Sequence, residues 1–113
     1  REVKPIFSEV FRILKHGGIF LGGYDNGINY LLDDDEKTII NTMPFDPLVN
    51  EEHRCQLERT DCGMQFSHTL EEQLGGQLEA GFVLTHLYGD TNGSGYLHEK
   101  NVETYLAVRA VKP

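Results

Sequence analysis

Apolar residues recur at helical spacing in the N-terminal part of the chain. They fall on one stripe of a helix that the pattern predicts from Pro5 to Lys15. Pro5 suits the first helical turn, where its missing N–H is not needed. The pair Gly17-Gly18 that follows is typical of a left-handed helix end. We therefore expect an amphipathic helix with one buried face.

A second helix is predicted over Leu70–Ala80, where leucines recur every four residues. Thr69 and Glu72, three residues apart, match a capping box at its start. Gly75-Gly76 lies in the middle, where each glycine costs about 1 kcal/mol relative to alanine. We therefore expect the leucines to pack on a sheet, with the glycine pair at the closest approach.

Three stretches have the pattern of β-strands. Ile19–Tyr24 is short and apolar on both faces, which is typical of a strand buried in a parallel sheet. It directly follows the first helix, an order that fits a βαβ crossover. Phe82–Tyr88 is the second strand, and Tyr105–Val111, with alternating apolar positions, is the last. The predicted fold class is α/β.

The middle of the chain is predicted to form an inserted β-hairpin. Ile28–Asp33 and Lys37–Met43 have strand patterns and flank an acidic run, Asp33-Asp34-Asp35-Glu36, which is typical of a solvated turn. Leu48–Asp61 is polar with sparse apolar positions, and we expect a surface helix there. No linker divides the chain, so residues 1–113 are expected to form a single domain.

Composition argues against several classes of partner. The 113 residues include 10 Lys and Arg against 18 Asp and Glu, and the net charge of -8 disfavours nucleic acid and anionic membranes. No apolar run approaches the roughly 20 residues that span a bilayer. The two cysteines, Cys55 and Cys62, are too few for a disulfide scaffold, and the first residues have no signal-peptide pattern. We therefore expect a cytoplasmic protein.

Two groups of residues have partial metal-site patterns. Residues 90–97 match the first positions of a calcium-binding EF-hand, but the twelfth, which should be a bidentate Glu, is Asn101. The segment before them also has a strand pattern, whereas an EF-hand needs a helix. Possible zinc ligands without a tight Cys-x-x-Cys spacing are His53, Cys55, Cys62 and His68. We expect no metal site, and calcium at residues 90–101 is the weaker alternative.

The N-terminal segment resembles part of the class I S-adenosylmethionine-dependent methyltransferases. It is Glu9-Val-Phe-Arg-Ile-Leu-Lys-His-Gly-Gly-Ile-Phe-Leu21, similar to a helix ending in Arg-x-Leu-Lys-Pro-Gly-Gly and the fifth strand that follows it, with His16 in place of the proline. Residues 65–82 are similar to the penultimate helix of a bacterial subgroup, and residues 104–113 to its final antiparallel strand. The resemblance covers most of the chain.

This resemblance implies the C-terminal half of a Rossmann-like methyltransferase sheet, with residues 27–66 as a substrate-side insertion. The family binds S-adenosylmethionine through a Gly-x-Gly-x-Gly turn after its first strand and an acidic residue after its second, and the chain has neither element. The expected function is the substrate-side portion of a methyltransferase for a small molecule, inactive alone and without cofactor-binding residues. The alternative is a non-catalytic binding or assembly module.

The resemblance also indicates where a substrate would lie. Open α/β sheets bind ligands beyond the carboxyl ends of their strands. The candidate substrate-binding residues are Tyr24, Asp25, Asn26, Ser67, His68, Glu71 and Gln73. His68 is also the weak candidate for a proton acceptor, because an ordinary histidine titrates near neutrality. A simple turn at residues 25–27 and a loop histidine without a role are the alternatives.

The strand Ile19–Tyr24 would also lack its neighbour from the missing half. It contains no charge or proline that would prevent pairing at an exposed edge. We therefore expect association with an N-terminal half or with a second copy, most simply as a homodimer.

Overall fold

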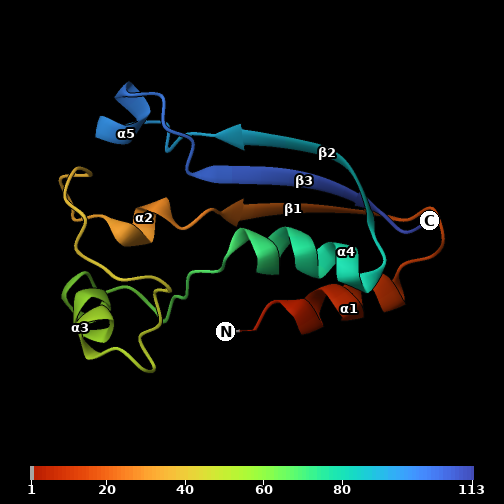
Figure 1. Cartoon of the computed structure of the whole chain (residues 1–113), viewed down its shortest axis with the longest axis horizontal. Helices are drawn as coiled ribbons and strands as arrows, with labels where there is room; N and C mark the ends of the chain where they lie inside the picture. Colours follow the sequence, from red (N-terminus) through yellow and green to blue (C-terminus); the bar gives the residue numbers. More distant parts are fainter. Residues whose placement is uncertain (1) are drawn as a thin grey trace.

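The computed structural model describes residues 2–113 of the chain, and Figure 1 shows its elements in colour along the sequence. The elements are α1 (Lys4–Ile13), β1 (Ile19–Asp25), α2 (Ile28–Leu31), α3 (Glu51–Arg59), the π-helical turn η1 (Glu71–Gly75), α4 (Gly76–Ala80), β2 (Val83–Asp90), α5 (Tyr96–Glu99) and β3 (Tyr105–Val111). The predicted α/β class is confirmed. Gly17, with a φ of 83°, provides the expected left-handed residue between α1 and β1.

The three strands form one sheet in the order β1-β3-β2. The last strand, β3, lies between the other two and is antiparallel to both, so β1 and β2 run in the same direction. The predicted antiparallel pairing of the last two strands is confirmed. In the described part of the chain β1 pairs only with β3, and Leu21 is 73% exposed. The expectation of a fully buried strand was therefore wrong.

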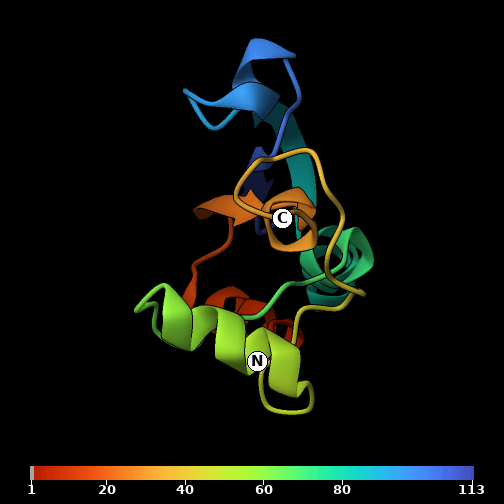
Figure 2. The ribbon, with the colours of Figure 1, turned by 90° about the vertical axis from the view of Figure 1, so that its left-hand side faces the viewer.

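Helices α1 and α4 lie side by side on one face of the sheet (Figures 1 and 2). Phe7 of α1 is 1% exposed and contacts the rings of Phe20 and Tyr24 edge-on, at centroid distances of 6.3 and 6.1 Å. A Cβ atom at Gly76 of α4 would lie 2.9 Å from the Phe7 ring. A glycine at this position therefore allows the two helices to approach closely, as the glycine pair suggested.

The leucines of the second helix do not form its buried face. Leu70 and Leu78 are 53% and 56% exposed, whereas Gln73 and Gln77 are buried. The cause is η1, in which the Gly76 N–H bonds the carbonyl of Glu71, five residues earlier. Such a π-helical turn departs from the 3.6-residue period on which the leucine pattern rests. The prediction of a leucine stripe on the sheet was therefore wrong.

The predicted β-hairpin is replaced by a short helix and a loop. A single bridge between Leu32 and Ile39 is all that the described residues show of it, and the first predicted strand is mostly α2. The cause lies just before α2, where the side chains of Asp25 and Asn26 accept hydrogen bonds from the backbone N–H groups two residues ahead. Such Asx turns favour a helix start over an extended strand.

The acidic turn and the surface helix of this region are confirmed. The Asp35 carboxylate accepts bonds from the Thr38 hydroxyl and from the N–H groups of Lys37 and Thr38, which lower its pKa to about 2. Helix α3 occupies most of the stretch predicted as helical. That residues 27–66 act as a substrate-side insertion remains a prediction.

The region around α3 has an apolar cluster of its own. Phe45 and His53 are each 1% exposed and stack with ring centroids 4.4 Å apart, and Tyr30 packs on Phe45 at 5.0 Å. Leu57 of α3 is 7% exposed. This cluster lies apart from the core between α1, α4 and the sheet, and fixes the loop between residues 41 and 50 against α3.

The face of the sheet opposite α1 and α4 carries no helix in the part of the chain that the structure describes (Figure 2). The exposed apolar residues on this face are Ile19, Leu21, Val83, Tyr88 and Tyr105. No helix of residues 2–113 is long and apolar enough to cross a membrane. The sheet therefore presents an apolar surface that is uncovered in this chain.

Candidate functional site

The carboxyl end of β1 is followed by two Asx turns that lead into α2. The Asp25 Oδ1 atom accepts a bond from the Gly27 N–H at 2.7 Å, and its Oδ2 atom accepts one from Asn29 at 3.3 Å. Asn26 accepts a bond from the Ile28 N–H and donates to the carbonyl of Glu103. Gly27 adopts a φ of 99°, so the chain turns sharply here. Two predicted site residues therefore hold the turn that follows the strand.

Tyr24 lies differently from its two neighbours. Its ring packs edge-on against Phe7, and its hydroxyl is buried without a hydrogen-bond partner in the described chain. Burial raises the pKa of this phenol above its usual value, so it stays protonated at neutral pH. The geometry gives Tyr24 a packing contact with α1.

Gln73 joins the second helix to the end of β1. Its Nε2 atom donates to the carbonyl of Asp25 at 2.8 Å, and the side chain is 3% exposed. Its Oε1 atom is buried and has no partner among the described residues. Two groups of predicted site residues, far apart in the sequence, therefore meet at this contact.

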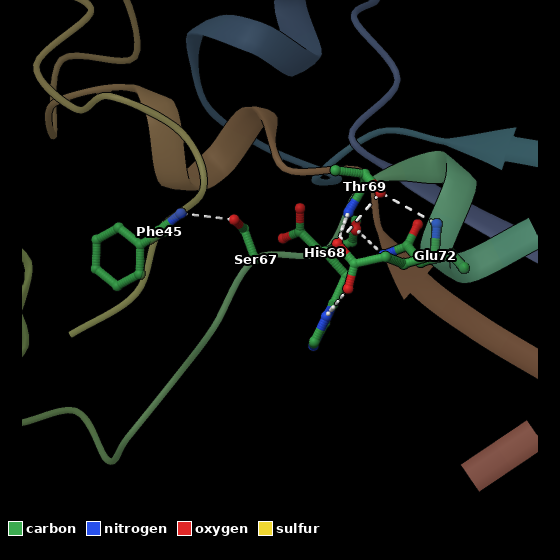
Figure 3. A network of polar contacts seen from close by, with 7 residues as sticks. Phe45, Ser67, His68, Thr69 and Glu72 are labelled. Atoms are coloured by element: carbon green, nitrogen blue, oxygen red, sulfur yellow. Dashed lines mark hydrogen bonds and ion pairs between the residues drawn. The ribbon is translucent and has the colours of Figure 1, made fainter. Parts of the chain in front are cut away.

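Ser67 and His68 lie on the segment that leads into the second helix (Figure 3). The Ser67 hydroxyl accepts a bond from the Phe45 N–H at 2.7 Å, and the backbone N–H of Ser67 donates to the carbonyl of Phe45. The Nδ1 atom of His68 lies 3.3 Å from a carboxylate oxygen of Glu72. This ion pair forms only when the imidazole is protonated.

A cavity of about 300 Å³ brings three of the predicted residues together. Its lining residues are Asn26, Met43, Pro44, Ser67, His68 and Thr69. Glu71 lies apart from this group, because its side chain is exposed and has no hydrogen-bond or ion-pair partner in residues 2–113. His68 therefore lines a cavity together with Asn26, the residue that follows β1.

A larger cleft of about 640 Å³ opens on the other side of Asp25. It is lined by Asp25, Asn29, Tyr30, Phe45, Gln56, Leu57, Thr60, Cys62, Gln65, Asn92 and Tyr105. We call it the Asp25 cleft. Its volume is in the range of small-molecule sites. Asp25 is its one lining residue among the predicted site residues. Cys62 and Asn92 had been considered only as possible metal ligands, and no pattern in the sequence pointed to the others.

Asn29 and Asn92 form the floor of this cleft through a reciprocal pair of amide hydrogen bonds, at 3.0 and 2.9 Å. Thr104 donates to the same Asn92 oxygen at 2.6 Å. The loop that partly matches an EF-hand thus uses Asn92 for a contact within the fold. Strand β2 enters this loop, as predicted, where an EF-hand has a helix.

The potential zinc ligands are dispersed. His53 is buried against Phe45 and its Nδ1 atom accepts a bond from the Asp46 N–H, while Cys55 and Cys62 are exposed free thiols. Within residues 2–113 no group of three or more His, Cys, Asp or Glu side chains is arranged to hold a metal ion.

Neither of the glycine pairs Gly22-Gly23 and Gly75-Gly76 fits the cofactor turn of the methyltransferases. Gly22 and Gly23 lie inside β1, where they pair with Val108 and Ala107 of β3. Gly75 and Gly76 lie within the second helix. A turn that places backbone N–H groups beside a ligand needs glycines between a strand and the helix that follows it. These two glycine pairs therefore do not supply the cofactor turn of the methyltransferases.

The capping box before the second helix provides a pH-dependent test. The Glu72 N–H donates to the Thr69 hydroxyl at 3.1 Å, and the Glu72 carboxylate accepts bonds from the Thr69 N–H and hydroxyl. Burial alone would raise the pKa of Glu72, but the bonds from Thr69 and His68 lower it below 4.5. Its stabilising contribution is therefore complete above pH 4.5 and is lost as the pH falls through the lowered pKa.

We expect Thr69→Ala to lower the free energy of unfolding by about 1 kcal/mol at neutral pH. The pKa of Glu72 should rise toward 4.5, because two of the groups that stabilise its carboxylate are weakened or lost. Urea unfolding and an NMR titration of the Glu72 carboxyl would measure both effects. Thr69→Ser is the matched control, since it keeps the hydroxyl and should preserve both values.

Comparisons with known proteins agree with this fold. No family model matches the sequence. The chain is 32% identical over 117 aligned positions to the "uncharacterized methyltransferase YbaJ" of Bacillus subtilis, and the match covers 97% of the chain but 45% of the relative. The chain thus spans about half the length of this relative.

A solved structure, that of an S-adenosylmethionine-dependent methyltransferase from Mesorhizobium loti, matches with a TM-score of 0.66 at 15% identity. The match covers 98% of this chain and 56% of that one, so the likeness extends through all the elements described above. In sequence the chain is thus similar to part of a curated methyltransferase, and in fold it is similar to part of an S-adenosylmethionine-dependent methyltransferase.

Proposed function

We propose that this chain is the substrate-side portion of an S-adenosylmethionine-dependent methyltransferase that acts on a small molecule. The observation that carries the proposal is the sheet, in which the last strand is reversed and lies between β1 and β2, together with the 32% identity to a curated methyltransferase. The cavities at the carboxyl end of β1 lie where open α/β sheets bind ligands.

S-adenosylmethionine would be held by a second polypeptide segment, because the sequence contains no Gly-x-Gly-x-Gly turn. The cofactor supplies the methyl group, and this chain would bind and orient the acceptor. His68 lines the smaller cavity and would receive the acceptor's proton, with the Glu72 carboxylate 3.3 Å from its Nδ1 atom.

An exchange of segments with the relative tests this proposal. The aligned part of YbaJ, 45% of its length, is replaced by this chain, and S-adenosylmethionine binding is compared with that of the intact relative and of the relative lacking the aligned part. We expect the chimera to bind the cofactor more tightly than the truncated relative, because the chain completes the sheet. A folded chimera that binds no better than the truncated protein would refute the proposal.

A non-catalytic assembly module is the second candidate function, and the uncovered face of the sheet favours it. Leu21 and Tyr88 are 73% and 67% exposed there, and β1 is an edge without charge or proline between residues 19 and 24. Patches of this kind signal a missing partner. The partner would be the segment that completes the methyltransferase domain or, in its absence, a second copy of the chain.

We therefore expect the chain alone to form a dimer in sedimentation experiments at micromolar concentration in about 0.15 M salt. Repulsion from the net charge of -8 is screened beyond about 8 Å at this salt, whereas strand pairing acts at contact. Leu21→Lys should restore a monomer. Val49→Lys, at a position 75% exposed outside the sheet, is the control and should leave the dimer intact. A monodisperse wild-type monomer would contradict this expectation.

A further inference from the structure

The Asp25 cleft has a strongly asymmetric charge. Among its lining residues, Asp25 alone carries a charge at neutral pH, and none is Lys, Arg or His. Each Asp25 oxygen accepts one neutral hydrogen bond, from Gly27 and from Asn29, and no cationic side chain of residues 2–113 forms an ion pair with it. A carboxylate has about four acceptor positions, so Asp25 retains acceptor capacity toward the cleft.

Aromatic side chains form another part of the wall. Tyr30, Phe45 and Tyr105 all line the cleft, and Tyr105 is 43% exposed. The pKa of the Tyr30 phenol is raised, mainly by burial and secondly by the negative charge of Asp25. The phenol therefore stays neutral beside the carboxylate. Faces of neutral tyrosines attract cations, and more strongly where water is partly excluded. A carboxylate and aromatic faces around one cavity together favour a positively charged ligand.

We propose that the Asp25 cleft binds a small organic amine in its protonated form. The ammonium group would donate to the free acceptor positions of Asp25, and the apolar body would lie against Tyr30 and Tyr105. The side-chain amides of Asn29 and Asn92 line the cleft but are already hydrogen-bonded to each other. They therefore add little specificity for a ligand. This inference concerns binding by the chain alone, so it can fail or hold independently of methyl transfer.

Three probes of similar shape and different charge test the inference: phenethylamine, phenethyl alcohol and phenylacetate. Dissociation constants are measured by NMR titration of the full chain at pH 7. We expect the amine to bind about tenfold more tightly than the alcohol, the gain typical of one charge-assisted hydrogen bond, and phenylacetate to bind most weakly. The side-chain amide signals of Asn29 and Asn92 should shift with the amine. This mapping uses the wild-type chain and needs no variant.

Asp25→Asn then removes the charge and keeps an oxygen that can accept from the Gly27 N–H. It should reduce the affinity for the amine about tenfold and leave that for the alcohol unchanged. Asp34→Asn, an exposed carboxylate in the acidic turn away from the cleft, is the matched control and should change neither. Equal affinities for the three probes, no saturable binding of the amine, shifts confined to other parts of the chain, or a folded Asp25→Asn variant with unchanged amine affinity would each overturn the inference.

Discussion

Phe7→Ala should lower the free energy of unfolding by about 3–5 kcal/mol, the range for removing a buried phenylalanine. The ring is 1% exposed, contacts Phe20 and Tyr24 on the sheet, and lies against Gly76 of the neighbouring helix. No side chain nearby can fill the space, because the closest position on α4 is a glycine. Urea unfolding followed by circular dichroism would measure the loss.

The control for Phe7→Ala is the adjacent residue on the same helix. Ile6 is 55% exposed, so Ile6→Ala should cost less than about 1 kcal/mol. If the two variants lost similar stability, the packing of α1 against the sheet and α4 would be wrong.

Phe45→Ala should have a comparable effect of about 3–5 kcal/mol, through the separate cluster around α3. Phe45 is 1% exposed, stacks on the buried His53, and packs on Tyr30. Alanine keeps the backbone N–H that donates to the Ser67 hydroxyl, so the expected loss comes from the ring contacts. Chemical denaturation gives the stability, and amide hydrogen exchange would locate the loss to residues 41–68.

Leu48→Ala, in the same loop, is the matched control for Phe45→Ala. Leu48 is 51% exposed, and its truncation should cost less than about 1 kcal/mol. A loss below 1 kcal/mol for Phe45→Ala would show that residues 27–66 do not have the ordered apolar cluster described above.

Local patterns predicted much of the fold. The capping box of Thr69 and Glu72, the helix stop at Gly17 and the alternation of β3 each depend on residues that are neighbours in the sequence. The antiparallel pairing of β2 and β3 followed from the resemblance to the methyltransferases. The prediction of a β-hairpin failed because the side chains of Asp25 and Asn26 form Asx turns that lead into α2, and a period-2 apolar pattern does not register such turns.

The candidate site was predictable only in part. Asn26, Ser67 and His68 line one cavity, and Gln73 contacts the backbone of Asp25, as their common assignment suggested. The Asp25 cleft depends on contacts between distant residues, and Asn29 and Asn92 are 63 positions apart. Such a pair of amides leaves no periodic signal. The leucine pattern failed for a related reason, because a π-helical turn changes which side chains face the core.

The central claim is that this chain provides the substrate side of a methyltransferase and that the cofactor site lies outside it. Isothermal titration of S-adenosylmethionine, up to millimolar concentration, into residues 1–113 tests this claim most directly. We predict no saturable heat, because the glycine turn and the acidic residue that would grip the ribose are absent from the sequence. A dissociation constant in the micromolar range would contradict the claim.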